Sequence, residues 1–428
     1  MNDESDDINY DVIIVGAGPA GLSFARTLKD TNLKIGMIER ATLESIQNPA
    51  EDGREIALTH ATVKLMKDLG AWDRIKPELI SPIKTAKVFN GDSSYSLDFV
   101  RPTESMEALG YLIPNHLIRK AFYDEVATLD NVEVLSETSV DKIKTDDQKG
   151  TVTLSSGETL TAPLIVAADS RFSSTRRQMG VGAHMKDFSR TAIVCRMEHE
   201  VDHEQTAFEC FHYGKTMALL PMQGHMSSVV ITINSQKSDA LLDMSDEDFN
   251  AQIFEWFGNR LGKISLVGKR HSYPLVAVHA DNFVSNRYAV LGDASVGMHP
   301  VTAHGFNLGI RGADSLATAI KEAQEKGKDY SDLSVLKKYE KDHMHVTKFL
   351  YHGTNTIVGL FTLETGPAKF ARKALLRFAN NFPPLKNMIT GKLTEAEDTG
   401  KSHILPPLPP LPPLPFSKRF NDIFGANR

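Results

Sequence analysis

Cysteine is scarce in this sequence. Of the 428 residues, only Cys195 and Cys210 are cysteines, and neither belongs to a CxxC pair. This usage disfavours a disulfide-stapled fold and a zinc ribbon, and it is typical of a reducing compartment. We therefore expect a cytoplasmic protein.

Long apolar runs and a surplus of positive charge are missing as well. No run approaches the roughly 18–20 residues that span a bilayer, so we expect a soluble protein or a peripheral one at the inner face of a membrane. The formal net charge of −6 disfavours nucleic acid as a partner. The acidic opening, MNDESDDINYD, resembles neither a secretory signal nor an organelle presequence.

The composition that is present, 41% hydrophobic and 24% charged, is typical of a globular chain. At this length we expect two or three domains. Residues 190–235 and 264–280 are rich in strand-like alternation, and the pattern after Tyr339 is mainly helical. This order predicts a β-rich insertion between two returns of the chain to a cofactor domain.

The N-terminal segment YDVIIVGAGPAGLSFARTL, followed by LKIGMIER, predicts a β-α-β unit in a parallel sheet. Gly16, Gly18 and Gly21 have the spacing GxGxxG, which lets the backbone approach a pyrophosphate at the start of a helix. Glu39, beside Arg40, ends the second strand, where a carboxylate can hold the hydroxyls of an unphosphorylated ribose. The motif indicates FAD or NAD and does not choose between them.

Two later stretches carry further signals. One, from Asp169 to Arg176, is DSRFSSTR, and the other, from Gly292 to Gly309, is GDASVGMHPVTAHGFNLG. The second stretch allows two interpretations, a metal site built on its two histidines or a loop that lies against a cofactor. No third ligand is nearby in sequence, so we favour the cofactor loop and predict no metal.

Taken in order, the three motifs resemble those of the class A flavoprotein monooxygenases, and within them the hydroxylases of ubiquinone biosynthesis. That family has GxGxxG at the start, DGxxSxxR in the centre and GDAAHxxxPxxGQGxNxG late. The resemblance covers residues 10–380 and includes DGREIALTHATVKLMKDLGAWDRI, LGYLIPNHLIRKAF and MALLPM. Ser170 stands where the family has a glycine, which removes a position tolerant of positive φ. VGMHP and AHG replace the family's AAH and GQG.

The resemblance implies an α/β fold with a Rossmann-like FAD-binding domain, an inserted β-rich substrate domain of the aromatic-hydroxylase type and a helical C-terminal region. The expected FAD-binding domain comprises residues 1–80, 116–182 and 286–345. The expected substrate domain comprises residues 81–115 and 183–285. The helical region would be 346–400, and the proline-rich tail, with its LPPLPPLPPLP repeat, 401–428.

FAD is the cofactor that the resemblance implies. Asp293 would contact its ribityl or pyrophosphate part, and the backbone at Gly305 and Asn307 would stabilise negative charge on the reduced flavin. Arg54, Arg119 and Val140 are carried over as FAD contacts by position.

The central motif leaves alternatives open. Asp169 would contact the cofactor or cap a turn. Arg176 would serve the site or form a solvated salt bridge.

The implied reaction is hydroxylation of an electron-rich aromatic ring with O₂, through a flavin C4a-hydroperoxide and with NAD(P)H or another electron donor. Within this resemblance, the sequence GMHPVTAHGFN implies that the substrate is a polyprenylated ubiquinone precursor and that hydroxylation takes place at C5 of demethoxyubiquinol. His299, Pro300 and His304 are the candidate catalytic residues, because a histidine can move a proton near neutral pH. A hydroxylase of a soluble phenol and a non-catalytic protein on the FAD fold are the alternatives.

Two further predictions concern the substrate side. Five residues would line the aromatic pocket or pack in the core: Phe208, Phe211, Tyr213, Leu219 and Met222. The segment PAKFARKALLRFANNFPPLK predicts a basic amphipathic helix that rests on an anionic membrane surface, on a ubiquinone-biosynthesis complex or on its own domain. Its charges are Lys369, Arg372, Lys373 and Arg377.

Overall fold

The computed structural model describes residues 8–91, 93, 95–100, 106–212, 214–299, 304–362, 372, 390–391 and 394–395. Met1–Ala396 form one compact unit, and Glu397–Arg428 form a second. The second unit, which includes the proline-rich tail, lies outside the described residues, as do Lys369, Lys373 and Arg377. Arg372 is described and is fully buried, so its predicted place on an exposed basic face is wrong.

Four strands from the N-terminal half of the chain and two from residues 284–290 build a six-stranded sheet in the order β18-β19-β12-β1-β2-β8. Its strands are β1 (Val12–Val15), β2 (Ile35–Ile38), β8 (Val132–Leu135), β12 (Leu164–Ala167), β18 (Val284–Ser285) and β19 (Tyr288–Val290). β1 pairs in parallel with both β2 and β12. The runs VIIV, IGMI and LIVA are buried at every position, as expected for strands of a parallel sheet covered on both faces.

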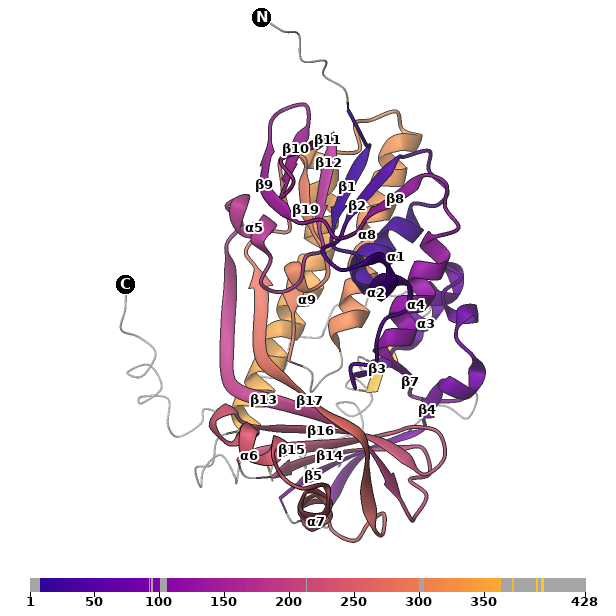
Figure 1. Ribbon diagram of the computed structural model, residues 1–428, viewed down its shortest axis with the longest axis vertical. Helices are drawn as coiled ribbons and strands as arrows, with labels where there is room; N and C mark the ends of the chain where they lie inside the picture. The colour runs from indigo at the N-terminus through magenta and orange to yellow at the C-terminus, as the bar shows by residue number, and fades with distance from the viewer. Residues whose placement is uncertain are drawn as a thin grey trace, which may run out of the picture. The chain divides into compact units, whose positions relative to one another are not determined.

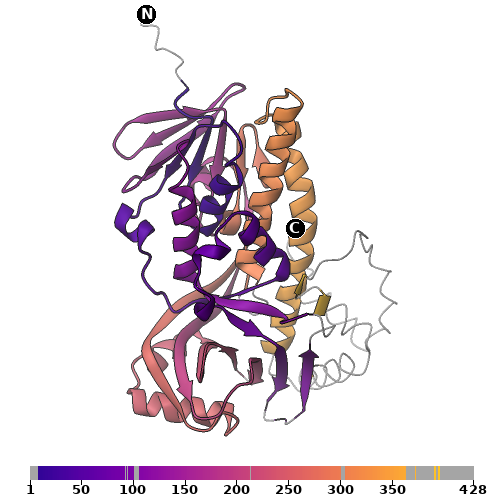
Figure 2. The same ribbon diagram turned by 90° about the vertical axis from the view of Figure 1, so that its right-hand side faces the viewer.

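Helices pack against this sheet and against one another. α1 (Pro19–Thr27) connects β1 to β2, which confirms the predicted β-α-β unit. α1 packs on α4 (Asn115–Val126) and on α8 (His304–Glu325), and α8 packs along α9 (Leu333–Thr362). Figure 2 shows α8 and α9 side by side, in orange.

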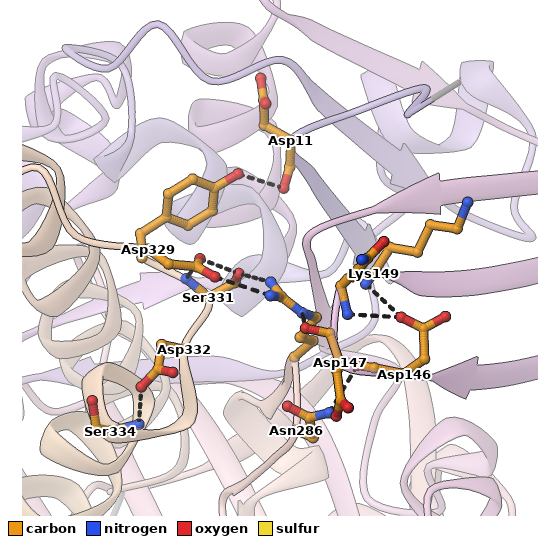
Figure 3. Close-up of polar contacts among 12 residues, drawn as sticks. Asp11, Asp146, Asp147, Lys149, Asn286, Asp329, Ser331, Asp332 and Ser334 are labelled. Atoms are coloured by element: carbon orange, nitrogen blue, oxygen red, sulfur yellow. Dashed lines mark hydrogen bonds and ion pairs between the residues drawn. The ribbon is translucent and has the colours of Figure 1, made fainter. Parts of the chain in front are cut away.

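A three-stranded meander flanks the six-stranded sheet, with β9 (Val140–Thr145), β10 (Gly150–Leu154) and β11 (Thr159–Ala162). Polar contacts attach its β9–β10 turn to the rest of the unit (Figure 3). Arg287 Nε donates to the Asp147 carbonyl at 2.8 Å, and Arg287 Nη2 pairs with Asp329 at 3.0 Å. Asn286 Nδ2 donates to the Asp146 carbonyl at 2.8 Å. This cluster ties three chain segments together, and none of its residues is among the described lining of the cavity described below.

The largest sheet has eight strands in the order β20-β17-β13-β16-β15-β14-β5-β6. Its strands are β5 (Thr85–Asn90), β6 (Ser96–Val100), β13 (Ala183–His199), β14 (Thr206–His212), β15 (Lys215–Pro221), β16 (Met226–Asn234), β17 (Ile264–Ala280) and β20 (Val296–Gly297). β13 and β17 are 17 residues each and run antiparallel beside one another. Figure 1 shows them passing from the region of α5 (Ser174–Gln178) to the other strands of this sheet.

One face of the eight-stranded sheet is covered by α7 (Asp246–Phe257), next to α6 (Ser238–Leu242) and the short turn η3 (Ser235–Lys237). Met217, Leu219 and Ile231 pack there against Phe249 and other apolar residues of α7. The opposite face is therefore available to form the wall of a cavity.

The remaining elements are a three-stranded sheet and several short helices, of which β3 and η4 contribute described lining residues to the cavity described below. β3 (Glu55–Leu58), β7 (Gly110–Pro114) and β4 (Ser81–Ile83) make an antiparallel sheet. The helices and 3₁₀ turns here are α2 (Leu43–Gln47), α3 (His60–Asp68), η1 (Trp72–Arg74), η2 (Pro77–Leu79) and η4 (Gly292–Ala294). In this part of the chain the strand β3 brings its first residues to the cavity.

Candidate active site

A cavity of about 450 Å³ lies where the sequence motifs and the eight-stranded sheet face one another. Its walls come from the β1–α1 turn, β3, the two later motifs, the start of α8 and the inner face of the eight-stranded sheet. Residues far apart in the sequence, such as Gly18, Asp293 and Leu220, therefore line one space. The three motifs that suggested a cofactor site are brought together by the fold.

The glycine turn has the geometry of a phosphate cradle. Gly18 is the N-cap of α1 and gives it no side-chain cap, so the first amides of the helix face the cavity beside Gly18, Pro19 and Ala20. Gly16 has φ +108°, and a Cβ there would lie 2.5 Å from the Ala168 carbonyl oxygen. A Cβ at Gly21 would lie 2.0 Å from the Gly16 carbonyl oxygen. The glycines are thus required for the turn, and the free amides suit an anionic pyrophosphate.

Glu39 lies at the end of β2, next to this turn. Its Oε2 accepts from the Ala17 amide at 2.8 Å, and its Oε1 accepts from the Ala41 amide at 3.0 Å. These two bonds fix the carboxylate beside the glycine turn. Arg40 is exposed, and neither residue is among those that line the cavity.

The central and late motifs meet through two arginines. Arg171 Nη2 pairs with Asp293 Oδ2 at 2.8 Å, and both residues line the cavity. Arg176 is buried, 2% exposed, and its Nη1 donates to the Ala294 carbonyl at 2.7 Å. The solvated salt bridge considered for Arg176 is therefore wrong, because its guanidinium braces the neighbouring loop from inside the protein.

The residues at the start of the central motif show why the turn forms. Asp169 Oδ2 accepts from the Thr175 amide at 3.2 Å and from the Thr175 hydroxyl at 3.0 Å, which is the turn-capping role. Ser170 has φ +75° and lines the cavity. The left-handed conformation that a glycine would favour is therefore kept by a serine, at a cost in backbone strain.

The late loop divides its predicted residues between cavity and core. Gly305 lines the cavity, and nothing lies within 4 Å of a Cβ built on it. The Asn307 side chain instead binds backbone, with Nδ2 donating to the Ala57 carbonyl at 2.9 Å and Oδ1 accepting from the Thr59 amide at 3.2 Å. Asn307 thus fixes α8 against the β3–α3 connection.

The three candidate catalytic residues are placed differently. Pro300 lies outside the described residues. His304 begins α8 and is buried, and it is not among the described residues that line the cavity. His299 does line the cavity, with the Phe188 ring edge-on at 4.9 Å between centroids. Burial, followed by the charges of Arg190 and Lys186, lowers the pKa of His299 to about 4, so the imidazole is neutral at neutral pH.

Of the residues carried over by position, only Arg54 lines the cavity. Its Nη2 pairs with Asp52 at 2.5 Å, and its guanidinium lies 5.3 Å from the centre of the Tyr273 ring. Arg119 lies in α4 and Val140 begins β9, and neither is among the lining residues.

The sequence missed two acids in the cavity wall. Glu55, the first residue of β3, has a side chain that is 1% exposed, and Arg196 Nη2 lies 2.8 Å from its Oε1. Burial outweighs the Arg196 charge and raises the pKa of Glu55 to about 7. Glu209, in β14, is the second acid. A single acid inside the apolar strand TAFECFH was the available signal.

Two alternatives were predicted for five residues of the substrate side, pocket lining and core packing. Phe208 and Leu219 pack on the α7 side of the sheet, and Phe211 packs with Leu97 and Phe99. The core alternative is therefore confirmed for these three. Tyr213 lies outside the described residues, and Met222 is not among the lining residues. The sheet residues that line the cavity are Glu209, Thr216, Ala218, Leu220, Val230 and Thr232.

Comparison with known proteins identifies the class. Residues 9–352 match the family model described as FAD binding domain. The chain therefore belongs to this family of FAD-binding proteins, which confirms the predicted resemblance and cofactor. The glycine cradle and the uncapped amides of α1 fit that cofactor.

Particular relatives narrow the class to flavoprotein hydroxylases. The chain is 51% identical over 391 residues to ubiquinone hydroxylase UbiM of Neisseria meningitidis, covering 90% of this chain and 85% of the relative. It is 32% identical over 378 residues to ubiquinone hydroxylase UbiL of Rhodospirillum rubrum, covering 88% of each.

Solved structures agree with the predicted fold. The p-nitrophenol 4-monooxygenase PnpA of Pseudomonas putida has a TM-score of 0.72 at 19% identity, with 90% of this chain and 98% of that chain covered. The fold class of an FAD-dependent aromatic monooxygenase, with its helical C-terminal region, is confirmed.

Proposed function

We propose that this chain hydroxylates the aromatic ring of a polyprenylated ubiquinone precursor. The 51% identity to a ubiquinone hydroxylase over 90% of the chain carries the proposal. The cavity supports it, because the FAD cradle and an apolar sheet face line the same space. Bound FAD would supply the redox chemistry that activates O₂, with NAD(P)H as the electron donor.

The protein's own residues would bind FAD, orient the substrate ring and exclude water from the site. The amides at the start of α1 would hold the pyrophosphate, and Glu39 the ribose. Asp293, held by Arg171 at 2.8 Å, would orient the ribityl chain, and Arg54 would sit beside the flavin. The backbone at Gly305, in the first turn of α8, would face the reduced ring. Neutral His299 would donate or accept a single hydrogen bond near the ring.

The apolar wall formed by Ala218, Leu220 and Val230 suits an electron-rich ring that carries a hydrocarbon tail. A tailed substrate would be taken from a membrane surface or from a ubiquinone-biosynthesis complex. Among the described residues, no helix is long and apolar enough to cross a membrane.

The experiment that tests the function is the quinone profile of cells lacking the gene. We expect accumulation of a demethoxy precursor, which would assign the C5 step, and restoration of the profile by the intact gene but not by Gly21→Ala. Accumulation of a precursor that lacks a different ring oxygen would assign the reaction to that other ring position. An unchanged profile, together with stimulation of NAD(P)H oxidation by polar phenols, would replace the proposal with a hydroxylase of a soluble phenol.

A further inference from the structure

Glu209 has no part in the site as described so far. It lies in the middle of β14, on the face of the eight-stranded sheet that forms the cavity wall. The other side chains that this sheet contributes are Thr216, Ala218, Leu220, Val230 and Thr232. Within the described lining, Glu209 is thus the one ionisable group on the sheet wall.

The strand register isolates this carboxyl among aliphatic side chains. Glu209 lies opposite Ala218, which lies opposite Val230 on the next strand. No hydrogen bond or ion pair joins Glu209 to another residue in the described part of the chain. Burial alone raises the pKa of Glu209 to about 8, so the carboxyl is mostly neutral at neutral pH.

Among the described lining residues, the two arginines, Asp293 and Glu55 already have charged partners. Arg54 pairs with Asp52, Arg171 pairs with Asp293, and Glu55 pairs with Arg196. Burial lowers the pKa of His299, so its imidazole is neutral at neutral pH. A half-buried acid without a partner on an apolar wall costs free energy and gives nothing to folding, and such groups in a cavity are typical of functional sites.

We infer that Glu209 is a catalytic residue whose neutral carboxyl hydrogen-bonds the ring oxygens of the substrate. Its O–H donates to a ring oxygen, and its C=O accepts from a ring hydroxyl. This pair of bonds orients the ring against the apolar wall. The assignment rests on the proposed function and narrows the substrate to an uncharged phenol or quinol. A ring carboxylate would find both arginines of the described lining already paired, Arg54 with Asp52 and Arg171 with Asp293.

The test measures binding of matched probes to the FAD-loaded protein by calorimetry. The probes are eugenol, its methyl ether methyleugenol, which lacks the ring hydroxyl, and vanillate, which carries a ring carboxylate. In Glu209→Leu we expect eugenol to bind about threefold to tenfold more weakly, the loss of one net hydrogen bond or more. Methyleugenol should lose less, because its ether oxygens can accept only the bond from the Glu209 O–H. Vanillate should bind the unmodified protein more weakly than eugenol.

The matched control is Glu198→Gln, which removes an exposed acid from β13 of the same sheet and should leave all probes unchanged. Glu209→Gln keeps donor and acceptor but cannot ionise. Eugenol affinity should therefore fall between pH 7 and 9 in the unmodified protein, as a group with a pKa of about 8 ionises, and stay level in Glu209→Gln. Glu209→Gln also provides the test if Glu209→Leu does not fold.

Three results would overturn the assignment: equal loss for eugenol and methyleugenol, no loss for either, or the same pH dependence in Glu209→Gln. Failure of the proposed function has a different signature. In that case the eugenol pattern would hold, and the quinone profile of the deletion cells would be unchanged. If the profile changes and the variants bind eugenol normally, the function stands and the role of Glu209 falls.

Discussion

Arg176 is among the largest side chains that the protein buries completely, and it joins two motifs that are far apart in the sequence. Its Nη1 reaches the Ala294 carbonyl, so the loop that carries Asp293 is held from the interior. The spacing of the central motif marked Arg176 as notable. Whether an arginine points to solvent or to a distant carbonyl depends on tertiary packing, which one local pattern does not contain.

We expect Arg176→Lys to lower the free energy of unfolding by about 1–3 kcal/mol, because a single ammonium would leave the buried Ala294 carbonyl poorly satisfied. FAD content after purification should fall with it. Urea unfolding and the flavin-to-protein absorbance ratio measure both effects. Arg177→Lys is the control, since exposed Arg177 also donates to a carbonyl, Phe172, but water can replace it there. Equal behaviour of the two variants would contradict the bracing role.

Ser170 is a second residue whose structural role could not be predicted from the local sequence. The family pattern has glycine here, and the serine suggested that a positive φ had been lost. The structure keeps φ at +75°. Backbone conformation is imposed by the surrounding loop, which the bond from the Thr175 amide to Asp169 closes. The residue type indicates which φ angle is preferred, but the surrounding loop determines the φ angle that Ser170 adopts.

At the scale of elements, strand alternation was visible in the sequence, but the direction of each face was not. Phe208 and Cys210 lie on one face of β14 because side chains alternate along a strand. Leu219 lies on the same face because it is paired with Phe208 on the neighbouring strand. Which face meets α7 and which meets the cavity depends on where the helix packs. For the aromatic residues the sequence therefore left pocket lining and core packing open, whereas the β-α-β unit, whose contacts are local, was predicted correctly.

The turn between β1 and α1 offers a sharp test. In Gly21→Ala the added Cβ would lie 2.0 Å from the Gly16 carbonyl oxygen, so helix and turn must separate. We expect loss of bound FAD and a fall of about 1–3 kcal/mol in the free energy of unfolding. The control is Gly353→Ala in α9, where nothing lies within 4 Å and up to about 1 kcal/mol should be gained. Full FAD content in Gly21→Ala would refute the cradle.

At the scale of the whole molecule, three buried histidines predict sensitivity to acid. Burial lowers the pKa of His279 and His299 to about 4 and that of His343 to about 3. Between pH 6.5 and 4 the unfolded chain binds protons that the native state does not, so these residues favour folding above pH 6.5 and lose that effect as the pH falls.

His279→Gln should therefore reduce the stability lost between pH 7 and 5 by about 1–2 kcal/mol, measured by urea unfolding at both values. His345→Gln, at an exposed position in α9, is the control and should leave the difference between the two pH values as it is. An identical acid loss in the unmodified protein and in His279→Gln would contradict this account.

Three dispersed motifs in order were enough to predict the cofactor and the class of the whole molecule. The joining of β5 to β14 was beyond the sequence, because it pairs residues 85–90 with residues 206–211. Glu55 was missed for a related reason. It lies in β3, and its burial depends on Arg196, 141 positions further along the chain.

The two long strands have a consequence for how such an enzyme can change its substrate. Ala183, the first residue of β13, pairs with Ala280, the last residue of β17. The chain thus leaves the nucleotide-binding part at Ala183 and returns to it at Ala280, and these two residues are neighbours. Recombination at these two neighbouring positions could replace most of the sheet that forms one wall of the cavity in a single event. A successful exchange would also have to supply a match for β5, the neighbour of the strand that carries Glu209.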